Sequence, residues 1–321
     1  MPLSPGESDG APKLIEPARV PMRLQTVRRQ FDLRAKRLSR HDVLLREVAG
    51  RLADRLDYIR LAPGRILDVG CGSGGSRELF NKRFASARWF GADLSLAMLN
   101  MHARAGGVMR SVLGHLFGNS RRNADLVCAD AAQLPFADGT FDLLFSNLML
   151  HWHPEPHTVF PEWKRVLSVE GLALFSCFGP DTLQELRAAC VEALGTPIPM
   201  PFIDMHDFGD MMVAAGLATP VMDVERIQLT YPSPRKLLDE VRALGGNPRD
   251  DRRRGLVSTA EARALLAALE RRRDPAGRIA LTFEIAYGHA WKPVPRKPNE
   301  SVISLERLRG GMPGRAPHGA R

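Results

Sequence analysis

Residues 65–75 of the chain read RILDVGCGSGG, in which a short apolar run leads into closely spaced glycines. The run predicts a buried strand over residues 65–69. Gly70, Gly72 and Gly74 stand at alternate positions, where the missing Cβ lets the backbone turn sharply and approach a bound molecule. A helix that begins after such a turn offers its first N–H groups to a ligand. The stretch therefore predicts a strand–turn–helix unit that binds a ligand.

The segments that follow alternate between short apolar runs and helical stretches, which is typical of a parallel sheet with helices on its faces. The first five predicted strands are residues 65–69, 87–92, 124–128, 141–146 and 171–177. Two longer runs of strand composition, residues 221–231 and 278–291, come near the end. We therefore predict an α/β fold, with a doubly wound, mostly parallel seven-stranded sheet, a closing antiparallel hairpin and a helical lid.

Shifts in composition predict the domain boundaries. In chain order, we expect a disordered leader (1–22), an N-terminal helical region (23–60), a main α/β domain (61–292) and a flexible basic tail (293–321). The N-terminal region has helical periodicity, which predicts one or two helices with a break at residues 39–42. Within the main domain, residues 180–215 and 234–273 are predicted to form lid insertions, and the glycine-containing stretch 106–123 a loop extension.

Acids end three successive predicted strands: Asp68, Asp93 in FGADLS and Asp130 in CADAAQLPF. The carboxyl ends of parallel strands meet at one edge, where open α/β sheets bind their ligands. Negative charge at Asp68 repels the pyrophosphate of a dinucleotide and suits the ammonium and sulfonium groups of S-adenosylmethionine. Asp93 can accept hydrogen bonds from ribose hydroxyls, and Asp130 can reach the adenine amine.

A second class of cofactor is an alternative at this site. Gly70, Gly72 and Gly75 also satisfy the dinucleotide pattern G-x-G-x-x-G, so a nicotinamide or flavin enzyme must be considered. The charge at Asp68 and the closing hairpin both disfavour this alternative.

With these residues considered together, the chain resembles the class I methyltransferases. The resemblance rests on DVGCGSGG, ADLS, AQLPFADGTFDLLFSNLMLHW and EWKRVLSVEGLALFS, within residues 64–176. One departure is RVLSVEGLAL, where the family usually has Pro-Gly-Gly before the fifth strand. The resemblance implies S-adenosyl-L-methionine as cofactor. The implied cofactor-binding residues are Asp68, Gly70, Gly72, Gly74, Asp93, Leu94, Asp130 and Ala131.

A narrower resemblance covers the flanking segments. RRQFDLRAKRLSRHDVLLREVAGRL, SNLMLHW and CFGPDTLQELR are similar to the malonyl-acyl-carrier-protein O-methyltransferases of biotin synthesis, although a Tyr expected shortly after FDLRA is not evident. That family methylates a free malonyl carboxylate, which implies a malonyl-loaded, acidic acyl-carrier protein as partner. FGPDTLQELR, ERIQLTYPSPRKLL and AYGHAWK are also similar to a mitochondrial complex I assembly factor regarded as an arginine hydroxylase. A protein hydroxylase or a non-catalytic assembly factor is therefore the alternative function.

The segment after the fourth strand supplies candidates for positioning a substrate: Asn147, His151 and Trp152. A carboxylate acceptor is ionised at neutral pH, so no catalytic acid or base is expected. Trp152 is interpreted as a packing wall, and His151 either orients the substrate or makes a structural hydrogen bond to a nearby carbonyl. Prolines interrupt the helix face that His153 and His157 would need to share, so no metal site is expected.

Charge and composition limit the classes of partner that this protein is expected to bind. The net charge is +9, and residues 23–60 carry 11 Lys/Arg against 5 Asp/Glu. Residues 249–273, with 8 against 4, and residues 292–321, with 7 against 2, are basic as well, which predicts attraction of an acidic partner. Nucleic acid is not expected, because no RNA-binding signature accompanies the basic segments. No signal peptide, membrane span or CxxC pair is evident, and a cytoplasmic location is predicted.

Overall fold

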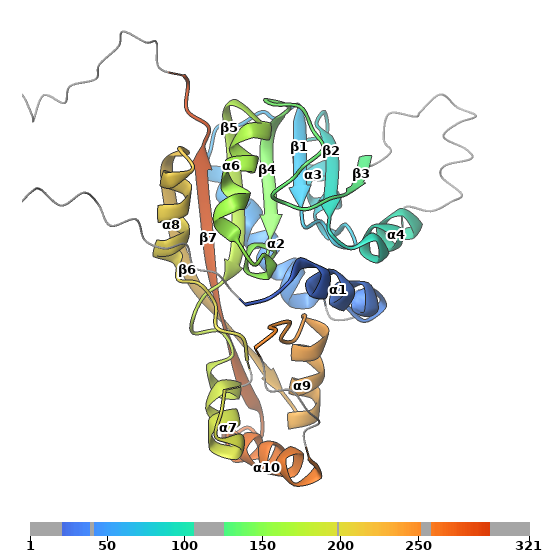
Figure 1. The fold of residues 1–321 in the computed structure, drawn as a ribbon, viewed down its shortest axis with the longest axis vertical. Helices are drawn as coiled ribbons and strands as arrows, with labels where there is room; N and C mark the ends of the chain where they lie inside the picture. The colour runs from blue at the N-terminus through green and yellow to red at the C-terminus, as the bar shows by residue number, and fades with distance from the viewer. Residues whose placement is uncertain (1–20, 39–41, 106–124, 198, 252–257, 296–321) are drawn as a thin grey trace, which may run out of the picture.

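One seven-stranded sheet organises the molecule (Figure 1). The computed structural model describes residues 21–38, 42–105, 125–197, 199–251 and 258–295. The strand order is β3-β2-β1-β4-β5-β7-β6, with the first five strands parallel and β7 antiparallel to both β5 and β6. The predicted α/β sheet with a closing antiparallel hairpin is confirmed. Residues 1–20, the predicted loop extension 106–123 and residues 296–321 lie outside the described residues.

The strands lie close to their predicted positions. They are β1 (Arg65–Val69), β2 (Arg88–Asp93), β3 (Asp125–Cys128), β4 (Phe141–Asn147), β5 (Leu167–Phe178), β6 (Ala218–Tyr231) and β7 (Ile279–Trp291). The largest difference is at β5, which begins four residues before the predicted start at Gly171. Leu167 pairs with Phe141, and the register then shifts before Leu143 pairs with Leu172. The sequence without Pro-Gly-Gly therefore continues as a bulged strand.

The helices lie before β1 and in the stretches between the strands, where helical segments were predicted. They are α1 (Leu24–Leu38), α2 (Val43–Asp54), the 3₁₀ turn η1 (Arg55–Tyr58), α3 (Gly75–Arg83), α4 (Leu96–Ala105), the 3₁₀ turn η3 (Leu150–Trp152), α6 (Pro156–Val166), α7 (Gln184–Leu194), α8 (Met205–Ala214), α9 (Pro234–Ala243) and α10 (Thr259–Glu270). Ser258 and Glu261 form a capping box that fixes the start of α10. The predicted N-terminal helical region is thus two helices, with residues 39–41 between them outside the described part.

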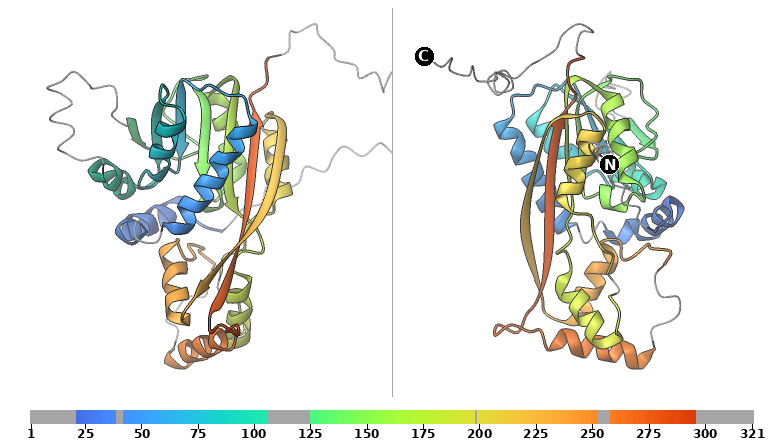
Figure 2. Two further views of the ribbon diagram at one scale, coloured as in Figure 1. Left: turned by 180° about the vertical axis from the view of Figure 1, so that it is seen from behind. Right: turned by 60° about the vertical axis from the view of Figure 1, so that its left-hand side comes forward.

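Helices cover both faces of the sheet (Figure 2). The alternation along β5 illustrates why: Leu172 and Leu174 belong to one buried cluster, whereas Ala173 and Phe175 belong to the other. Successive side chains of a strand point to opposite faces, so a strand buried on both faces is apolar throughout. Buried residues of α2, α3 and α4 share the first cluster, and those of α6 and α8 share the second.

The hairpin of β6 and β7 extends beyond the rest of the sheet. Pairing between β5 and β7 ends at Phe178 and Ile285, whereas β6 and β7 stay paired to Tyr231 and Ile279. Helices α7, α9 and α10 lie around this extension (Figure 1). Their buried apolar residues join the same cluster as α2 and α3, so the extension and the main sheet share a continuous core.

This arrangement differs from the predicted lid. Helix α8 packs against β6, β7 and α6 as part of a sheet-covering layer. Among the described residues of 180–215, none lines the cavity at the sheet edge, and Leu244 is the lining residue from 234–273. Helix α1 covers that cavity instead, beside α4 and close to α9 (Figures 1 and 2). The reason is that the apolar face of α1 packs on the sheet edge, which helical periodicity alone could not locate.

Replacing Phe175 by alanine should test this core. The ring is fully buried, and Phe160, Trp163 and Phe208 lie around it with ring centroids 5.5 to 6.0 Å away. We expect Phe175→Ala to lower the free energy of unfolding by about 3–5 kcal/mol. Val213→Ala, on the exposed side of α8, is the control and should change it by about 0.5 kcal/mol or less. Urea denaturation that gives similar midpoints for both variants would contradict this assignment.

Candidate functional site

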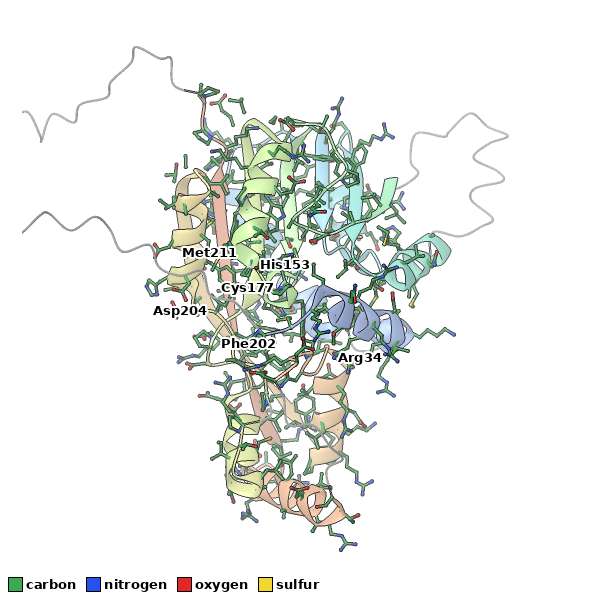
Figure 3. The ribbon with its side chains drawn as sticks, in the orientation of Figure 1. Arg34, His153, Cys177, Phe202, Asp204 and Met211 are labelled. Carbon is green, nitrogen blue, oxygen red and sulfur yellow. The ribbon has the colours of Figure 1, made fainter. Side chains whose placement is uncertain are left out.

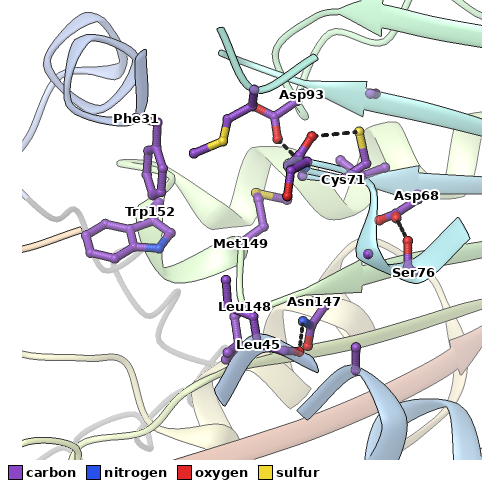
Figure 4. Close-up of a pocket in the computed structure, with 18 of the residues that line it drawn as sticks. Phe31, Leu45, Asp68, Cys71, Ser76, Asp93, Asn147, Leu148, Met149 and Trp152 are labelled. Carbon is purple, nitrogen blue, oxygen red and sulfur yellow. Dashed lines mark hydrogen bonds between the residues drawn. The ribbon is translucent and has the colours of Figure 1, made fainter. Parts of the chain in front are cut away.

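A cavity of about 490 Å³ lies at the carboxyl ends of β1, β2 and β4, beneath α1 (Figure 4). Its position agrees with the edge where open α/β sheets bind ligands. The predicted cofactor-binding residues that line it are Asp68, Gly70, Gly72, Asp93, Leu94, Asp130 and Ala131. Asn147 and Trp152 line it too. The structure thus brings together seven of the eight residues predicted for the cofactor, with Gly74 outside the lining.

Asp68 is buried at the end of β1, and its carboxylate accepts a hydrogen bond from Ser76 Oγ in the first turn of α3 (Figure 4). Within the described residues it has no ion-pair partner. Burial raises the pKa of Asp68 to about 7, against the lowering effect of the Ser76 bond, and the nearby charge of Asp93 raises it further. An ionised Asp68 therefore gains most from a cation placed in the cavity.

Asp93 holds the glycine turn in place. It ends β2, whose register sets Val69 opposite Ala92, and its Oδ2 accepts a hydrogen bond from Gly72 N at 2.8 Å. Its Oδ1 accepts a bond of 2.8 Å from Ser95 N. Burial raises the pKa of Asp93 to about 6, although these two backbone bonds oppose the shift. Asp93 consequently serves the protein's own backbone in addition to any ligand.

Glycine is required at three positions of the turn, for a different physical reason at each. Gly70 has φ +79°, and a Cβ there would come within 2.5 Å of the Met149 side chain. At Gly72, φ is +54° and a Cβ would meet no protein atom within 4 Å, so the turn leaves open space beside the amide that Asp93 holds. Gly74 has φ +87°, and a Cβ there would collide with the His102 ring. Gly74 thus permits close packing beside the turn.

Asp130 is oriented by a histidine that sequence reasoning had left without a role. His153 Nδ1 accepts a hydrogen bond from Glu155 N at 3.1 Å, which leaves the proton of the neutral ring on Nε2. That nitrogen lies 3.1 Å from Asp130 Oδ1, which also accepts from Ala132 N at 2.9 Å. Burial alone would raise the pKa of Asp130, but the bonds from His153 and Ala132 outweigh it and lower the pKa. Asp130 is therefore held ionised.

The three candidates for positioning a substrate differ in what their side chains contact. The Asn147 amide donates to Leu45 O at 2.9 Å and accepts from Ser176 Oγ at 2.8 Å, so it ties α2 to the sheet (Figure 4). Trp152 packs edge-on against Phe31 of α1, with ring centroids 5.4 Å apart. This contact makes Trp152 part of the cavity wall, next to α1.

His151 lies behind that wall. It is absent from the cavity lining, and it is buried among aromatic rings beside Phe178 and Phe202 (Figure 3 labels Phe202). Its Nδ1 accepts a hydrogen bond from Phe178 N at 3.3 Å. Burial lowers the pKa of His151 to about 3, so the ring is neutral at physiological pH. His151 thus has a structural hydrogen bond, but its partner is the N–H of Phe178 and not the carbonyl that was predicted.

The cavity has lining residues that sequence reasoning missed. Leu148 has φ +51°, a costly conformation for a branched side chain, and its N–H is held by Ser176 O at 3.0 Å. This strained turn places Leu148 and Met149 in the lining, and Phe31 of α1 lines the cavity as well. The sequence carries no local signal for Leu148, because a positive φ at leucine is imposed by surrounding contacts. Within the described residues, no group of three or more potential metal ligands is present.

The residues present fit S-adenosylmethionine. The cavity is of the size that holds small cofactors, which is roughly 300–1,000 Å³. A buried acid at the glycine turn suits a cationic ligand, and the open space at Gly72 leaves room for that ligand beside the backbone. Asp93 and Asp130 follow along the same edge, at the ends of β2 and β3, as acceptors for a ligand's hydroxyl and amine groups.

Comparison with known proteins agrees with this fit. Residues 67–175 match the family model described as a methyltransferase domain. The protein YcgJ of Bacillus subtilis superposes with a TM-score of 0.50 at 15% identity, over 76% of this chain and 98% of that one. A Bacillus halodurans protein described as a candidate methyltransferase superposes with a TM-score of 0.51 at 17% identity, over 77% and 99%. At these identities the superpositions establish the fold.

Curated relatives narrow the family. The chain is 44% identical to the malonyl-[acyl-carrier protein] O-methyltransferase of Laribacter hongkongensis, over 84% of this chain and 90% of that protein. It is 40% identical to the enzyme of the same name in Methylovorus sp., over 84% and 89%. No described helix is long and apolar enough to cross a membrane. The chain therefore belongs to the malonyl-[acyl-carrier protein] O-methyltransferase family and is an S-adenosylmethionine-dependent methyltransferase.

Proposed function

We propose that this enzyme transfers the methyl group of S-adenosylmethionine to the free carboxylate of a malonyl group on an acyl-carrier protein, a step of biotin synthesis. The observation that carries the acceptor is the shared name of relatives 38–44% identical to most of this chain. The bound cofactor supplies an electrophilic methyl group on a sulfonium. The malonyl carboxylate is ionised at neutral pH, so the chain needs no general base. A cytoplasmic location stays a prediction from the sequence.

The cavity residues divide the work of binding. In this proposal Asp68 attracts the cofactor's positive charge, Asp93 accepts from the ribose hydroxyls, and Asp130, held by His153, accepts from the adenine amine. The backbone at Gly72 approaches the cofactor because no Cβ fills the open space beside it.

The acceptor side of the cavity is apolar. Phe31 and Trp152 form a wall that excludes water, which strengthens the electrostatic attraction between the carboxylate and the sulfonium. Asn147 fixes the strained turn beside the acceptor through its contacts with Leu45 and Ser176. Catalysis then rests on alignment and on exclusion of water, without a proton transfer by the chain.

The acceptor is tested by a product assay. Purified protein is incubated with methyl-labelled S-adenosylmethionine and malonyl-acyl-carrier protein, with acetyl-acyl-carrier protein as the matched control that lacks a free carboxylate. We expect label to enter the malonyl form alone, as an ester that mild base releases. Labelling of both forms would place the methyl group elsewhere. No labelling of any malonyl thioester would overturn the proposed acceptor and favour the assembly-factor alternative.

Binding of the cofactor should depend on pH through Asp68. Its pKa of about 7 exceeds the unfolded value, so in the ligand-free protein ionisation of Asp68 costs stability as the pH rises from about 4 to 7. A cationic ligand prefers the ionised form, so its affinity should rise by about tenfold from pH 6 to pH 8. Calorimetry with S-adenosylmethionine measures this rise.

Asp68→Asn is the matched control for that titration. It keeps the size of the side chain and its bond with Ser76, but it carries no charge. We expect weaker binding of the cofactor at pH 8 and a flatter dependence of affinity on pH. The pH dependence that remains comes from the titratable groups of the ligand itself. If the native protein and the variant have the same pH dependence, Asp68 is not the group that meets the positive charge.

A further inference from the structure

The outward face of α1 has an exposed apolar residue between two basic ones. Leu33 is 77% exposed, the most exposed leucine among the described large hydrophobic residues. Arg29 and Arg37 lie one turn before and one turn after it, on the same side of the helix. Both arginines are exposed, and neither forms an ion pair within the described residues. Their charges are therefore available to a partner.

The opposite face of α1 forms a wall of the cofactor cavity. Val27, Phe31 and Leu38 line the cavity and are spaced by four and seven residues, which places them on one stripe. Leu33 follows Phe31 by two residues, so it points about 200° away from that stripe at 3.6 residues per turn. A single helix, roughly 10–12 Å thick, thus separates the outward face from the cavity.

Helix α4 adds a second exposed apolar residue beside this face. Asp32 accepts hydrogen bonds from Ser95 Oγ at 2.6 Å and from Ala97 N at 3.3 Å, which joins α1 to the start of α4. Leu96 stands between these two contacts and is 50% exposed. The joint brings Leu33, next to Asp32, and Leu96 to the same region of the surface. Two such side chains, beside two arginines that form no ion pair with a described residue, exceed the scattered single residues of an ordinary surface.

The charge of α1 favours one kind of occupant. The helix has five Lys/Arg residues against one Asp, and Asp32 is already engaged by the start of α4. Arg34 is engaged as well, since it donates to Gly245 O on the segment after α9 (Figure 3 labels Arg34). The outward positions that remain attract a negatively charged protein and offer its apolar side chains a contact.

We propose that Arg29, Leu33, Arg37 and Leu96, together the α1 outer surface, are the docking site of the acidic carrier protein. This inference rests on the proposed function and places the carrier next to the cavity wall. A substrate on a flexible tether can reach around α1 into the cavity, while its carrier protein stays outside. The carrier's carboxylates pair with Arg29 and Arg37, and its apolar side chains cover Leu33 and Leu96.

Charge reversal and truncation test this surface. For Arg29→Glu/Arg37→Glu and for Leu33→Ser, we expect the Kd for malonyl-acyl-carrier protein, measured by surface plasmon resonance, to rise about tenfold or more. The KM for that substrate should rise in parallel. The kinetics with malonyl-coenzyme A, a small thioester, should change by about twofold or less, because the cavity face of α1 is untouched.

Matched controls lie at the opposite end of the sheet. Arg60→Glu/Arg65→Glu reverses two exposed arginines near the amino end of β1, and Tyr58→Ser removes an exposed aromatic residue. These variants should leave the Kd for the carrier unchanged. A carrier Kd that is equal in native protein and α1 variants would overturn the docking site, as would an equal loss in the controls.

Two further outcomes separate the docking site from its premise. If the native protein methylates neither malonyl-acyl-carrier protein nor malonyl-coenzyme A, the proposed acceptor fails, and the carrier Kd still decides the docking site by itself. If sedimentation finds a dimer of the native chain that Leu33→Ser dissociates, the surface belongs to a second copy and the carrier assignment is wrong.

Discussion

A buried carboxylate that has no cation partner among the described residues is the constraint around which this site is built. Asp68 loses its hydration at the end of β1 and receives in return a hydrogen bond from Ser76. Most buried acids are neutralised by a nearby base, and their pKa then falls. Here burial raises the pKa of Asp68 to about 7 and that of Asp93 to about 6, so ionisation of these acids is unfavourable unless a cation lies beside them. Binding of a cation relieves this cost, which gives the cavity its preference among nucleotide-like ligands.

The rest of the cavity keeps those acids in place and apart from solvent. The parallel register of β1 and β2 brings Asp93 beside the glycine turn, where it accepts from Gly72 N. His153, in the segment after β4, fixes Asp130 through a hydrogen bond. Helix α1 lines one side of the cavity, where Phe31 contacts Trp152, and the same helix presents its other face to the surroundings. The same element can therefore couple recognition outside with chemistry inside.

Much of the fold could be read from the sequence by itself. The strand–glycine–helix unit at residues 65–75, the apolar runs of the parallel strands and the long closing strands are local patterns, and each lies where it was predicted. Seven of eight predicted cofactor residues line one cavity, because strand order in an open α/β sheet brings the carboxyl ends of neighbouring strands together. The excess of Lys and Arg in the N-terminal helices could likewise be counted in the sequence.

Contacts between distant segments were decided by the tertiary structure alone. Residues 180–215 and 234–273 were predicted to be a lid, yet α8 packs on the sheet and α7, α9 and α10 surround the extended hairpin. Gly74 does not line the cavity but allows close packing against His102. His153 orients Asp130, although the two residues are 23 positions apart in the sequence. The physical reason is common to these cases. Periodicity and motif spacing determine which face of an element is apolar and which acids end a strand, because these depend on near neighbours. Which surface an apolar face covers, and which donor meets a buried acid, depends on how the whole chain packs.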